Sequence, residues 1–404
     1  MRIALVNKYL RPKGGADIVV LKTAALLRDH GHQVVLLGMA PAEGIARELP
    51  AYLVSPVDYD APLTFRQRAG AALRLLYSLE AKRKMRELIG AERPDVVHFN
   101  NIYHQLSPSV IAAAAAAGLP TAMTLHDYKL SCPVYSHRRA GAPCEQCAGR
   151  RFLNAFRFRC TDGSAAKSLL NTVEMYLHHQ VMGVYRKVDV FLSPSRFLRR
   201  KVLDMGFRGR ILHLPNFVQA DRFRPRYDWD GRRIAYLGRL SPEKGLTTLL
   251  AAVKGLDVEL LIIGTGPQAD ELKAKAAAEN IGNVSFVGYR AGAELHRLLA
   301  GCMFTLMPSE CYENNPLSVL ESFALGKPVV GADVGGIPEL VTEDRGALFP
   351  PGDREALRER ITRLLGDPGA VRAMGRAARL HVERHLNADV FYERLMTVYR
   401  GLSG

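Results

Sequence analysis

The chain has 404 residues, which is too long for one ordinary domain and predicts two or three. Its hydrophobic fraction of 48% and charged fraction of 24% are typical of a soluble globular protein, and no apolar run reaches the roughly 18 residues of a membrane-spanning helix. The formal net charge of +15 predicts anionic partners such as nucleotides or an acidic membrane face. Nucleic acid is disfavoured, because the sequence has no zinc-finger histidine pair, RNP-type aromatic motif or basic helix-turn-helix signature.

The first forty residues predict one βαβ unit with glycines at its strand-to-helix turn. RIALVN is a short apolar run typical of a strand, and the loop YLRPKGGAD follows it with Gly14 and Gly15. The stretch from Ile18 to Arg28 has helical periodicity, and QVVLLG is the next strand. Because the chain starts directly as a strand and lacks the features of a signal peptide, we expect a cytoplasmic protein.

Apolar strand runs and helical segments alternate along the rest of the chain. DVVHFN, TAMTL and VDVFLSPS precede residue 214, and RIAYLGRL, VELLIIG, VSFVG, FTLMPS, KPVVGAD and GALFP follow residue 232. The stretch between them is charged, contains prolines and has no clean period. We therefore predict an α/β protein with two Rossmann-like domains, residues 1–214 and 233–384, joined by a linker over residues 215–232. Residues 385–404 are expected to form a helix that packs back on the N-terminal domain.

A basic segment of the first domain also contains the apolar run LRLLYSL. Its cations are Arg66, Arg68, Arg74, Lys82, Arg83, Lys84 and Arg86. The pattern predicts one amphipathic, basic helix. A solvated helix face is one interpretation, and a peripheral contact with the anionic inner face of the cell membrane is the other.

Two loops of the second domain follow predicted strands and carry candidate ligand groups. YLGRLSPEKGLTTLL places Arg239 and Lys244 beside the N-terminus of a helix, an arrangement that suits a diphosphate. A surface loop with two solvated cations is the alternative. LIIGTGP places Gly264 where a backbone approaches closely, either to a ligand or to the neighbouring loop.

The stretch PSECYENNPLSVLESFALG contains two glutamates across a predicted helix start. Asn315 is a suitable N-cap and Pro316 suits the first helical position. The free amides beside Asn314, Asn315 and Leu317 could hold an anion or a sugar hydroxyl. Glu313 lies in the loop before the helix. Glu321 lies in its second turn, where a surface acid paired with a cation is the alternative interpretation.

Together these motifs resemble the retaining, two-Rossmann-domain glycosyltransferases of family 4. The resemblance is carried by the E-x7-E spacing, the GRLSPEKG loop and the GKPVVGADVGGIPEL run, with PKGGAD, TLHDY and VFLSPS in the first domain, so it covers nearly the whole chain. It implies the GT-B fold, in which two Rossmann-like domains face each other across a cleft. The first domain would bind the acceptor and the second the nucleotide sugar.

The resemblance also implies roles for individual residues. Arg239 and Lys244 would hold the donor's diphosphate, Glu321 the ribose hydroxyls, and Glu313 the hydroxyls of the donor sugar. Gly14 and Gly15 would let a loop close over the phosphates, and His126, at the end of TLHD, would lie near the sugar. The implied donor-binding set is Gly14, Gly15, Arg239, Lys244, Gly264, Glu313, Asn314, Asn315, Pro316, Leu317 and Glu321, and the implied catalytic set is His126, Glu313, Arg239 and Lys244.

The chain departs from the family pattern at two places. Many relatives have Glu where this chain has Asp17, and many have Gly-Phe-Gly where this chain has Asn314, Asn315 and Pro316. The backbone role can survive the second change, whereas the sugar bound there can differ from that of the relatives.

The implied reaction transfers a sugar from a UDP-, GDP- or similar donor to a glycan or lipid-linked acceptor with retention at the anomeric carbon. The acceptor would attack the face from which the diphosphate departs, and a phosphate oxygen would take its proton. No catalytic metal is expected, because no Asp-x-Asp motif lies in a suitable loop. A sugar phosphorylase or nucleotide-sugar epimerase of the same fold, or a nucleotide-sugar-binding protein without turnover, are the alternatives.

Four cysteines fall within a long insertion at about residues 128–165. They are Cys132, Cys144, Cys147 and Cys160. The Cys-x2-Cys spacing within this set suits a metal ion, so a structural zinc site is one interpretation, in which His137 could replace one ligand. Reduced thiols packed in a loop are the other, and a disulfide is disfavoured in a cytoplasmic chain.

Overall fold

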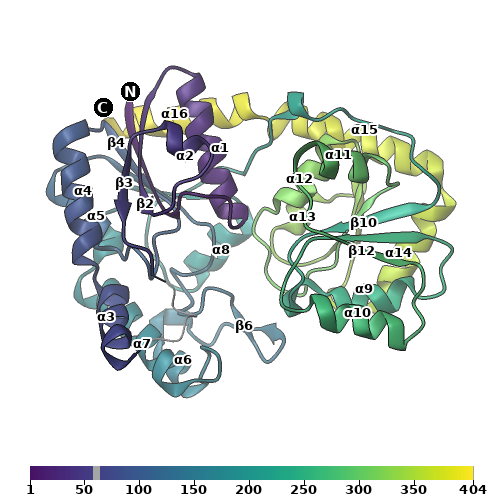
Figure 1. The fold of residues 1–404 in the computed structure, drawn as a ribbon, viewed down its shortest axis with the longest axis horizontal. Helices are drawn as coiled ribbons and strands as arrows, with labels where there is room; N and C mark the ends of the chain where they lie inside the picture. The colour runs from purple at the N-terminus through teal and green to yellow at the C-terminus, as the bar shows by residue number, and fades with distance from the viewer. Residues whose placement is uncertain (58–63, 404) are drawn as a thin grey trace. The chain divides into compact units, whose positions relative to one another are not determined.

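The computed structural model describes residues 1–57 and 64–403, which divide into two compact units. Unit 1 comprises Met1–His137, Cys144–Leu214 and the residues from Tyr392 to the C-terminus, and unit 2 comprises Arg138–Pro143 and Pro215–Phe391. Each unit contains one parallel sheet with helices packed on its faces (Figure 1). The α/β fold class predicted from the sequence is confirmed.

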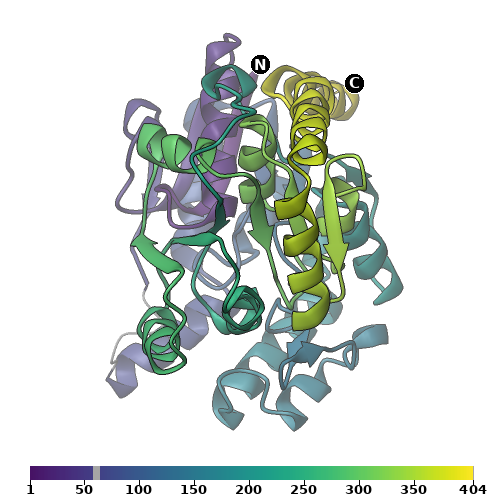
Figure 2. The same cartoon turned by 90° about the vertical axis from the view of Figure 1, so that its right-hand side faces the viewer.

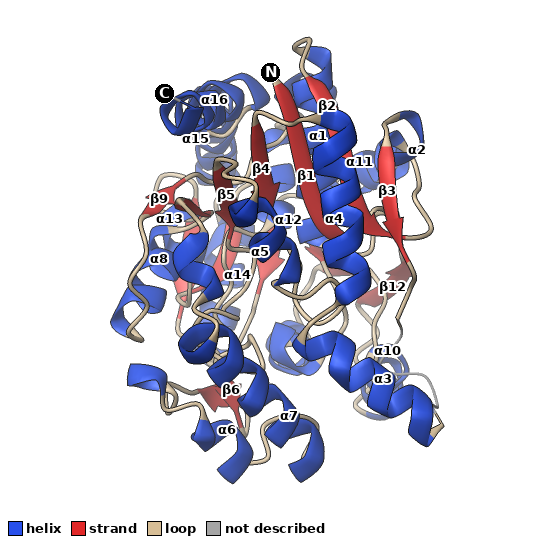
Figure 3. Ribbon diagram, turned by 90° about the vertical axis from the view of Figure 1, so that its left-hand side faces the viewer, coloured by secondary structure: helices blue, strands red, loops and turns tan. Residues whose placement is uncertain are grey.

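Unit 1 is built on a seven-stranded sheet in which every neighbouring pair is parallel. Its first strand in chain order registers Ile3 with Val34 on one side and with Val96 on the other. Residues Ile3 to Val6 are almost fully buried, as expected for a strand covered on both faces. In spatial order the strands are β3 (Ala51–Val54), β2 (Gln33–Met39), β1 (Arg2–Tyr9), β4 (Val96–Phe99), β5 (Thr121–Thr124), β8 (Val190–Ser193) and β9 (Ile211–His213) (Figure 3).

Helices connect these strands and cover the sheet. They are α1 (Gly15–Asp29), α2 (Ile45–Glu48), α3 (Phe65–Leu76), α4 (Leu79–Glu92), α5 (Ser109–Ala116), α6 (Leu153–Arg157), α7 (Ala165–Tyr176) and α8 (Arg196–Asp204), with shorter helical turns η1 (Ala148–Arg150), η2 (Leu177–Val181) and η3 (Val184–Lys187). The C-terminal helix α16 (Ala388–Ser403) contributes Tyr399 to this unit. The buried Tyr399 hydroxyl forms a 2.6 Å hydrogen bond with His98 Nδ1 on β4.

The basic segment of unit 1 forms two helices, so the prediction of one helix is wrong. Helix α3 ends before Tyr77, whose backbone is extended, and α4 starts after Ser78. Ser78 Oγ accepts the Ala81 amide and thereby caps α4, while the Ser78 amide donates to Ser107 Oγ at 2.8 Å. The break is therefore stabilised by a contact with a distant loop, which local periodicity does not reveal.

Unit 2 is built on a six-stranded parallel sheet (Figure 2). Its strands, in spatial order, are β12 (Val284–Gly288), β11 (Glu259–Ile263), β10 (Arg233–Leu237), β13 (Thr305–Met307), β14 (Val329–Ala332) and β15 (Gly346–Phe349). Tyr236, Phe304, Phe323 and Phe349 are fully buried around it. A two-stranded antiparallel hairpin, β6 (Arg138–Arg139) and β7 (Ala142–Pro143), is grouped with this unit.

The helices of unit 2 follow the same alternation. They are α9 (Leu246–Val253), α10 (Ala269–Ala278), α11 (Gly292–Ala300), α12 (Leu317–Ala324), α13 (Ile337–Leu340), α14 (Arg354–Gly366) and α15 (Pro368–His385), with the turns η4 (Ala220–Arg222) and η5 (Pro242–Lys244). Across the described residues of both units, no helix is long and apolar enough to cross a membrane.

Both sheets reverse their winding direction at one point. In unit 1 the chain moves outward from β1 to β3 and then returns to β4 on the other side of β1, and in unit 2 it does the same around β10 and β13. In open α/β sheets, ligands bind beyond the carboxyl ends of the strands at such a switch point. The loops after β1 and β4, and those after β10 and β13, are therefore where functional residues are expected.

Candidate active site

The loop after β10 is held in shape by close backbone contacts. Gly245 has φ +68°, and a Cβ there would lie 1.9 Å from the Pro308 carbonyl oxygen, so only glycine allows this loop to touch the end of β13. The buried Tyr236 hydroxyl donates to the Arg239 carbonyl at 2.8 Å. The Arg239 guanidinium is exposed and forms no ion pair among the described residues. It therefore remains available to a ligand.

Lys244 and Glu313 form an ion pair across the switch point of unit 2. Lys244 Nζ donates to Glu313 Oε1 at 2.5 Å, and Ser309 Oγ donates to the same oxygen at 2.7 Å. Burial alone would lower the pKa of Lys244, but the adjacent Glu313 carboxylate holds that pKa well above its usual value. The ammonium is therefore charged throughout the physiological pH range.

The loop after β14 fixes the backbone of Glu313. The Gly336 amide donates to the Glu313 carbonyl at 2.7 Å. Gly335 has φ +65°, and a Cβ there would lie 2.4 Å from the same carbonyl oxygen. The GADVGG loop therefore fixes the backbone position of Glu313, although it contributes no charged group to the Lys244–Glu313 ion pair.

The start of α12 differs from the prediction at Asn315. Pro316, not Asn315, is the N-cap residue, and no side chain caps the helix. Asn315 is buried, its Oδ1 accepts the Asn216 amide at 3.1 Å, and its carbonyl accepts from Asn216 Nδ2 at 2.8 Å. The predicted capping role is wrong because this distant partner occupies the side chain. The first amides of α12, from Leu317 on, face the helix N-terminus without a side-chain acceptor.

Glu321 lies one turn beyond Leu317 on the same face of α12. Its side chain is half-buried and already has a contact within the protein. Asn314, directly after Glu313, is likewise half-buried and has a contact of its own. Both therefore belong to the α12 end of the switch point.

Gly264 approaches a neighbouring loop. It has φ +143°, and a Cβ there would lie 1.9 Å from the Gly238 carbonyl oxygen. Of the two interpretations of this glycine, the structure supports loop packing after β10 and β11. The predicted direct contact with the donor stays a prediction.

In unit 1, Gly14 and Gly15 begin α1 at the switch point. Gly14 is the N-cap residue with extended backbone, and no side chain caps the helix. Asp17, in the first turn, is buried and accepts from Asn7 Nδ2 at 2.9 Å, while Asn7 Oδ1 accepts the Asn101 amide after β4. Asp17 therefore ties the start of α1 to the loops after β1 and β4.

His126 lies beyond β5 with its ring oriented by a loop residue. Its Nε2–H donates to Asn100 Oδ1 at 3.0 Å. Burial, with a smaller effect from Lys8, lowers the pKa of His126 to about 4. The imidazole is therefore neutral at pH 7 and can act as a hydrogen-bonding group but not as a resident cation.

Two charged residues at this edge were missed from the sequence. Burial lowers the pKa of Lys8, which Asp127 and Asp17 oppose, and burial raises the pKa of Asp127, whose Oδ1 accepts the Lys129 amide. The signal was available, because Lys8 is the penultimate residue of the RIALVNKY strand and Asp127 follows His126 in TLHDY. Polar residues at the carboxyl ends of β1 and β5 fall on the edge where ligands bind.

Two sequence families match the chain, one on each half. The family described as Glycosyl transferase 4-like domain matches residues 14–216, half of the chain, and that described as Glycosyl transferases group 1 matches residues 218–381. The chain belongs to glycosyltransferase family 4. The family resemblance recognised in the sequence motifs is confirmed, and the protein is a glycosyltransferase.

The relatives of this chain include two mannosyltransferases. The chain is 26% identical over 422 residues to phosphatidyl-myo-inositol mannosyltransferase of Mycolicibacterium smegmatis, covering 100% of this chain and 95% of that enzyme. It is 31% identical over 237 residues to the GDP-mannose-dependent monoacylated alpha-(1-6)-phosphatidylinositol monomannoside mannosyltransferase of Corynebacterium glutamicum. The second match covers 52% of this chain and 62%, less than two thirds, of that enzyme.

A solved structure shares the fold along the whole length of this glycosyltransferase. Sucrose-phosphate synthase from Thermosynechococcus elongatus superposes with a TM-score of 0.74 at 20% identity, covering 99% of this chain and 98% of that one. At this identity the likeness shows the GT-B fold alone.

The four cysteines of this glycosyltransferase's insertion are free thiols. Burial, with Coulombic contributions from Cys132, Cys160 and Cys144, raises the pKa of the Cys147 thiol to about 12. Within residues 1–57 and 64–403, no group of three or more His, Cys, Asp or Glu side chains is placed to hold a metal ion. Zinc at these cysteines stays a prediction, and metal analysis of the purified protein tests it.

Proposed function

We propose that this glycosyltransferase moves a sugar from a nucleotide-diphosphate donor to a glycan or lipid-linked acceptor and retains the anomeric configuration. The observation that carries the proposal is the Lys244–Glu313 pair, which lies beside the uncapped N-terminus of α12 at the switch point of unit 2. A fixed cation and free helix amides form a site for an anion.

The donor's diphosphate would be held by Lys244, Arg239 and the first amides of α12. As the bond between the anomeric carbon and the phosphate oxygen breaks, negative charge grows on the diphosphate. Lys244 is already charged and held by Glu313, so it stabilises this charge without first reorganising. Arg239 contributes from the exposed side of the β10 loop.

Glu313 would bind the donor sugar through its second oxygen. Oε1 accepts from both Lys244 and Ser309, whereas Oε2 accepts no hydrogen bond among the described residues. Glu321, one turn into α12, would accept from the ribose hydroxyls. In unit 1, the neutral imidazole of His126, whose ring is oriented by Asn100, is a hydrogen-bonding group suited to a hydroxyl.

Transfer with retention requires the acceptor hydroxyl to attack the face from which the diphosphate leaves. The bond from the acceptor oxygen to the anomeric carbon forms, the bond to the phosphate oxygen breaks, and the acceptor proton passes to a phosphate oxygen. In this scheme no side chain needs to be a nucleophile, which agrees with a Glu313 whose Oε1 is already used by Lys244.

We also propose that the acceptor is met at an anionic membrane face. Both relatives carry names that refer to phosphatidylinositol substrates, which reside in membranes, and this chain has a formal net charge of +15.

A transfer assay tests the proposal. The full chain is incubated with radiolabelled UDP-, GDP- and ADP-sugars and phosphatidylinositol vesicles, and the anomeric configuration of the product is read by proton NMR. We expect transfer or slow hydrolysis with one donor and a product of retained configuration. Release of sugar only when inorganic phosphate is added would indicate a phosphorylase. Binding without turnover would indicate a binding protein, and neither binding nor turnover would contradict the proposal.

A further inference from the structure

Helix α7 of unit 1 has its polar side chains turned inward and its apolar side chains turned outward. A helix on the surface of a soluble protein has the opposite pattern. On this helix Leu169 and Val173, one turn apart, are 45% and 44% exposed. The side chains that it buries are largely polar: Ser168, Asn171, Thr172 and Glu174, with Met175.

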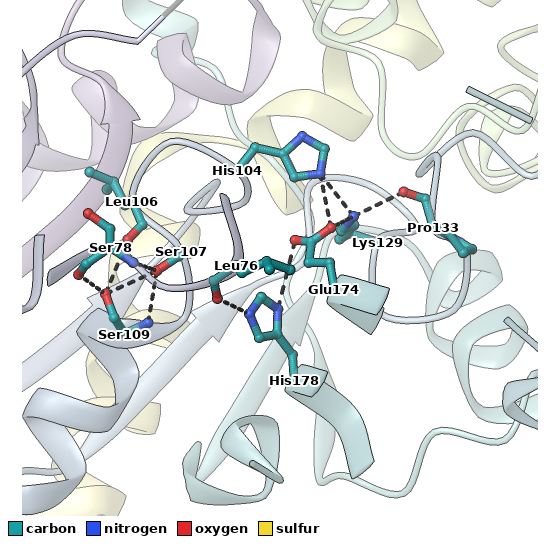
Figure 4. A network of polar contacts seen from close by, with 10 residues as sticks. All are labelled: Leu76, Ser78, His104, Leu106, Ser107, Ser109, Lys129, Pro133, Glu174 and His178. Carbon is teal, nitrogen blue, oxygen red and sulfur yellow. Dashed lines mark hydrogen bonds and ion pairs between the residues drawn. The ribbon is translucent and has the colours of Figure 1, made fainter. Parts of the chain in front are cut away.

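The inward face is held by a buried network of charged and polar groups, so the orientation of α7 is fixed. Glu174 and Lys129 are both fully buried, and Lys129 Nζ donates to Glu174 Oε2 at 2.6 Å (Figure 4). His104 Nε2 lies 3.2 Å from the same oxygen, and Lys129 also donates to the Pro133 carbonyl at 3.0 Å. Although burial raises the pKa of Glu174, the Lys129 ammonium holds it below its usual range.

Rolling α7 to bury Leu169 and Val173 would break this network. A buried carboxylate separated from its cation is strongly destabilising, so the outward apolar face is enforced by the interior. The exposure of Leu169 and Val173 is therefore a fixed feature of the fold, and these side chains are available for contact with a partner.

The neighbouring elements also expose apolar side chains. Helix α6 packs on α7 through Phe152 and Tyr176, whose ring centroids are 5.5 Å apart, and it exposes Leu153 and Phe156. Val181, at the end of η2, is 76% exposed. Helices α6 and α7 lie side by side at the end of unit 1 far from the N-terminus (Figures 1 and 3). We call Leu153, Phe156, Leu169, Val173 and Val181 the outer face of α6–α7.

This concentration of exposed apolar side chains is local. Of the eleven exposed large apolar residues in the described part of the chain, nine belong to unit 1 and five form the outer face of α6–α7. Only Tyr289 and Leu380 belong to unit 2. A clustered apolar patch of this kind marks an interaction site, whereas scattered single residues do not.

The charges around the outer face are mostly positive. Of the two acids between residues 150 and 187, Glu174 is buried against Lys129, and Asp162 pairs with Lys167 at 2.9 Å. The cations of the same segment are Arg150, Arg151, Arg157, Arg159, Lys167, Arg186 and Lys187. Exposed apolar side chains with exposed arginines in the same segment complement a surface that is apolar inside and anionic outside.

We propose that the outer face of α6–α7 docks on an anionic lipid bilayer. Its apolar side chains would enter the boundary between headgroups and acyl chains, and the exposed Arg151, Arg157 and Arg159 would meet lipid phosphates. This surface is separate from the basic α3–α4 segment singled out in the sequence. Its purpose rests on the proposed function, because a lipid-linked acceptor resides at the bilayer, but docking itself needs no turnover.

Vesicle co-sedimentation of the full chain tests the proposal. One set of vesicles contains phosphatidylcholine with about one third phosphatidylglycerol, the other phosphatidylcholine alone. We expect binding to the anionic vesicles only. The double variant Phe156→Glu/Val173→Glu should lower the apparent affinity about tenfold or more, because it removes apolar insertion and adds like charge. The matched variant Tyr289→Glu/Leu380→Glu, on exposed apolar residues of unit 2, should bind as the wild type does.

Thermal melting of each variant shows whether a loss of vesicle binding results from unfolding. If both double variants melt as the wild type does and only the outer-face variant loses vesicle binding, the proposal is supported. Equal vesicle binding by both variants would overturn the proposal. So would a wild type that does not bind anionic vesicles, and an acidic protein would then be the partner to test on the outer face of α6–α7. Vesicle binding without any nucleotide-sugar turnover would instead count against the proposed function and leave docking intact.

Discussion

The two switch points have the same strand order, but the ionisable groups beside them differ in which form, charged or neutral, their surroundings favour. In unit 2, Glu313 raises the pKa of Lys244 against the effect of burial, and the result is a fixed cation. In unit 1, burial sets the direction of the shift for four groups at the sheet edge: it lowers the pKa of Lys8 and His126 and raises that of Asp17 and Asp127. The same strand order therefore supports a charged edge in one unit and an edge that favours neutral forms in the other.

Because of this difference, the two units suit different chemical groups of a ligand. A charged edge with uncapped helix amides suits a diphosphate, whose charge increases during transfer. An edge that disfavours charge suits hydroxyl groups, which are recognised by neutral donors and acceptors such as His126 and Asn100. The loops of unit 2 are also fixed by glycine contacts at Gly245, Gly264 and Gly335, so its charges cannot easily move apart.

The largest effect is expected from removing Lys244, the fixed cation of unit 2. We expect Lys244→Ala to lower kcat/KM about 10³-fold, because it deletes a group that stabilises the leaving diphosphate and leaves Glu313 without its partner. The matched control is Lys273→Ala, an exposed lysine on α10, which should keep full activity. A loss below about tenfold for Lys244→Ala would contradict the role assigned to it.

Neutralising the acid partner should have the next largest effect. We expect Glu313→Gln to lower kcat/KM about 10²-fold and to change the pH profile. Without the carboxylate, burial lowers the pKa of Lys244, so activity should fall with rising pH earlier than in the wild type. Steady-state kinetics from pH 6 to 10 measure this, and an unchanged basic limb would show that Glu313 does not control Lys244.

The loop geometry of unit 2 can be tested separately from its charge. Gly245→Ala combines φ +68° with a clash at the Pro308 carbonyl, whereas Gly255 has φ +71° and open space around it. We expect Gly245→Ala to destabilise the protein by about 2–4 kcal/mol and Gly255→Ala by about 1 kcal/mol. Chemical denaturation compares them, and equal losses would mean that the contact between loops contributes nothing.

The neutral character of unit 1 predicts acid sensitivity. Burial lowers the pKa of His98 to about 3, so between roughly pH 6.5 and 3 the unfolded chain binds more protons than the folded one. Stability should therefore fall as pH drops through this window, by up to about 1.4 kcal/mol per pH unit for this histidine. His98→Gln should flatten the slope.

The fold class could be predicted from the sequence because buried parallel strands leave a strong local signal. Runs such as RIALVN and VELLIIG are continuous because helices cover both faces of their sheets. The break at Tyr77 and Ser78 could not be predicted in the same way. It depends on Ser107 and Ser109, about thirty residues later in the chain, and a periodicity argument sees only neighbours.

Individual residues of the candidate site could be predicted from the sequence, but the contacts between residues that are distant in the sequence could not. Lys244 and Glu313 were identified in separate loops, but their ion pair spans 69 positions in the sequence. Asn315 looks like an N-cap locally, yet Asn216, 99 positions away, determines what its side chain does. The inverted faces of α7 were not predicted, because the buried Glu174 is paired with Lys129 and His104, which lie on other segments.

Ligand-induced stabilisation tests the central claim most directly. Thermal melting of the wild type and of Lys244→Ala is recorded with UDP-, GDP- and ADP-sugars at increasing concentration. The account predicts that one nucleotide sugar raises the Tm of the wild type with its concentration and that Lys244→Ala loses most of this shift. An equal shift in Lys244→Ala, or no shift with any nucleotide sugar, would show that the Lys244–Glu313 pair is not a donor site.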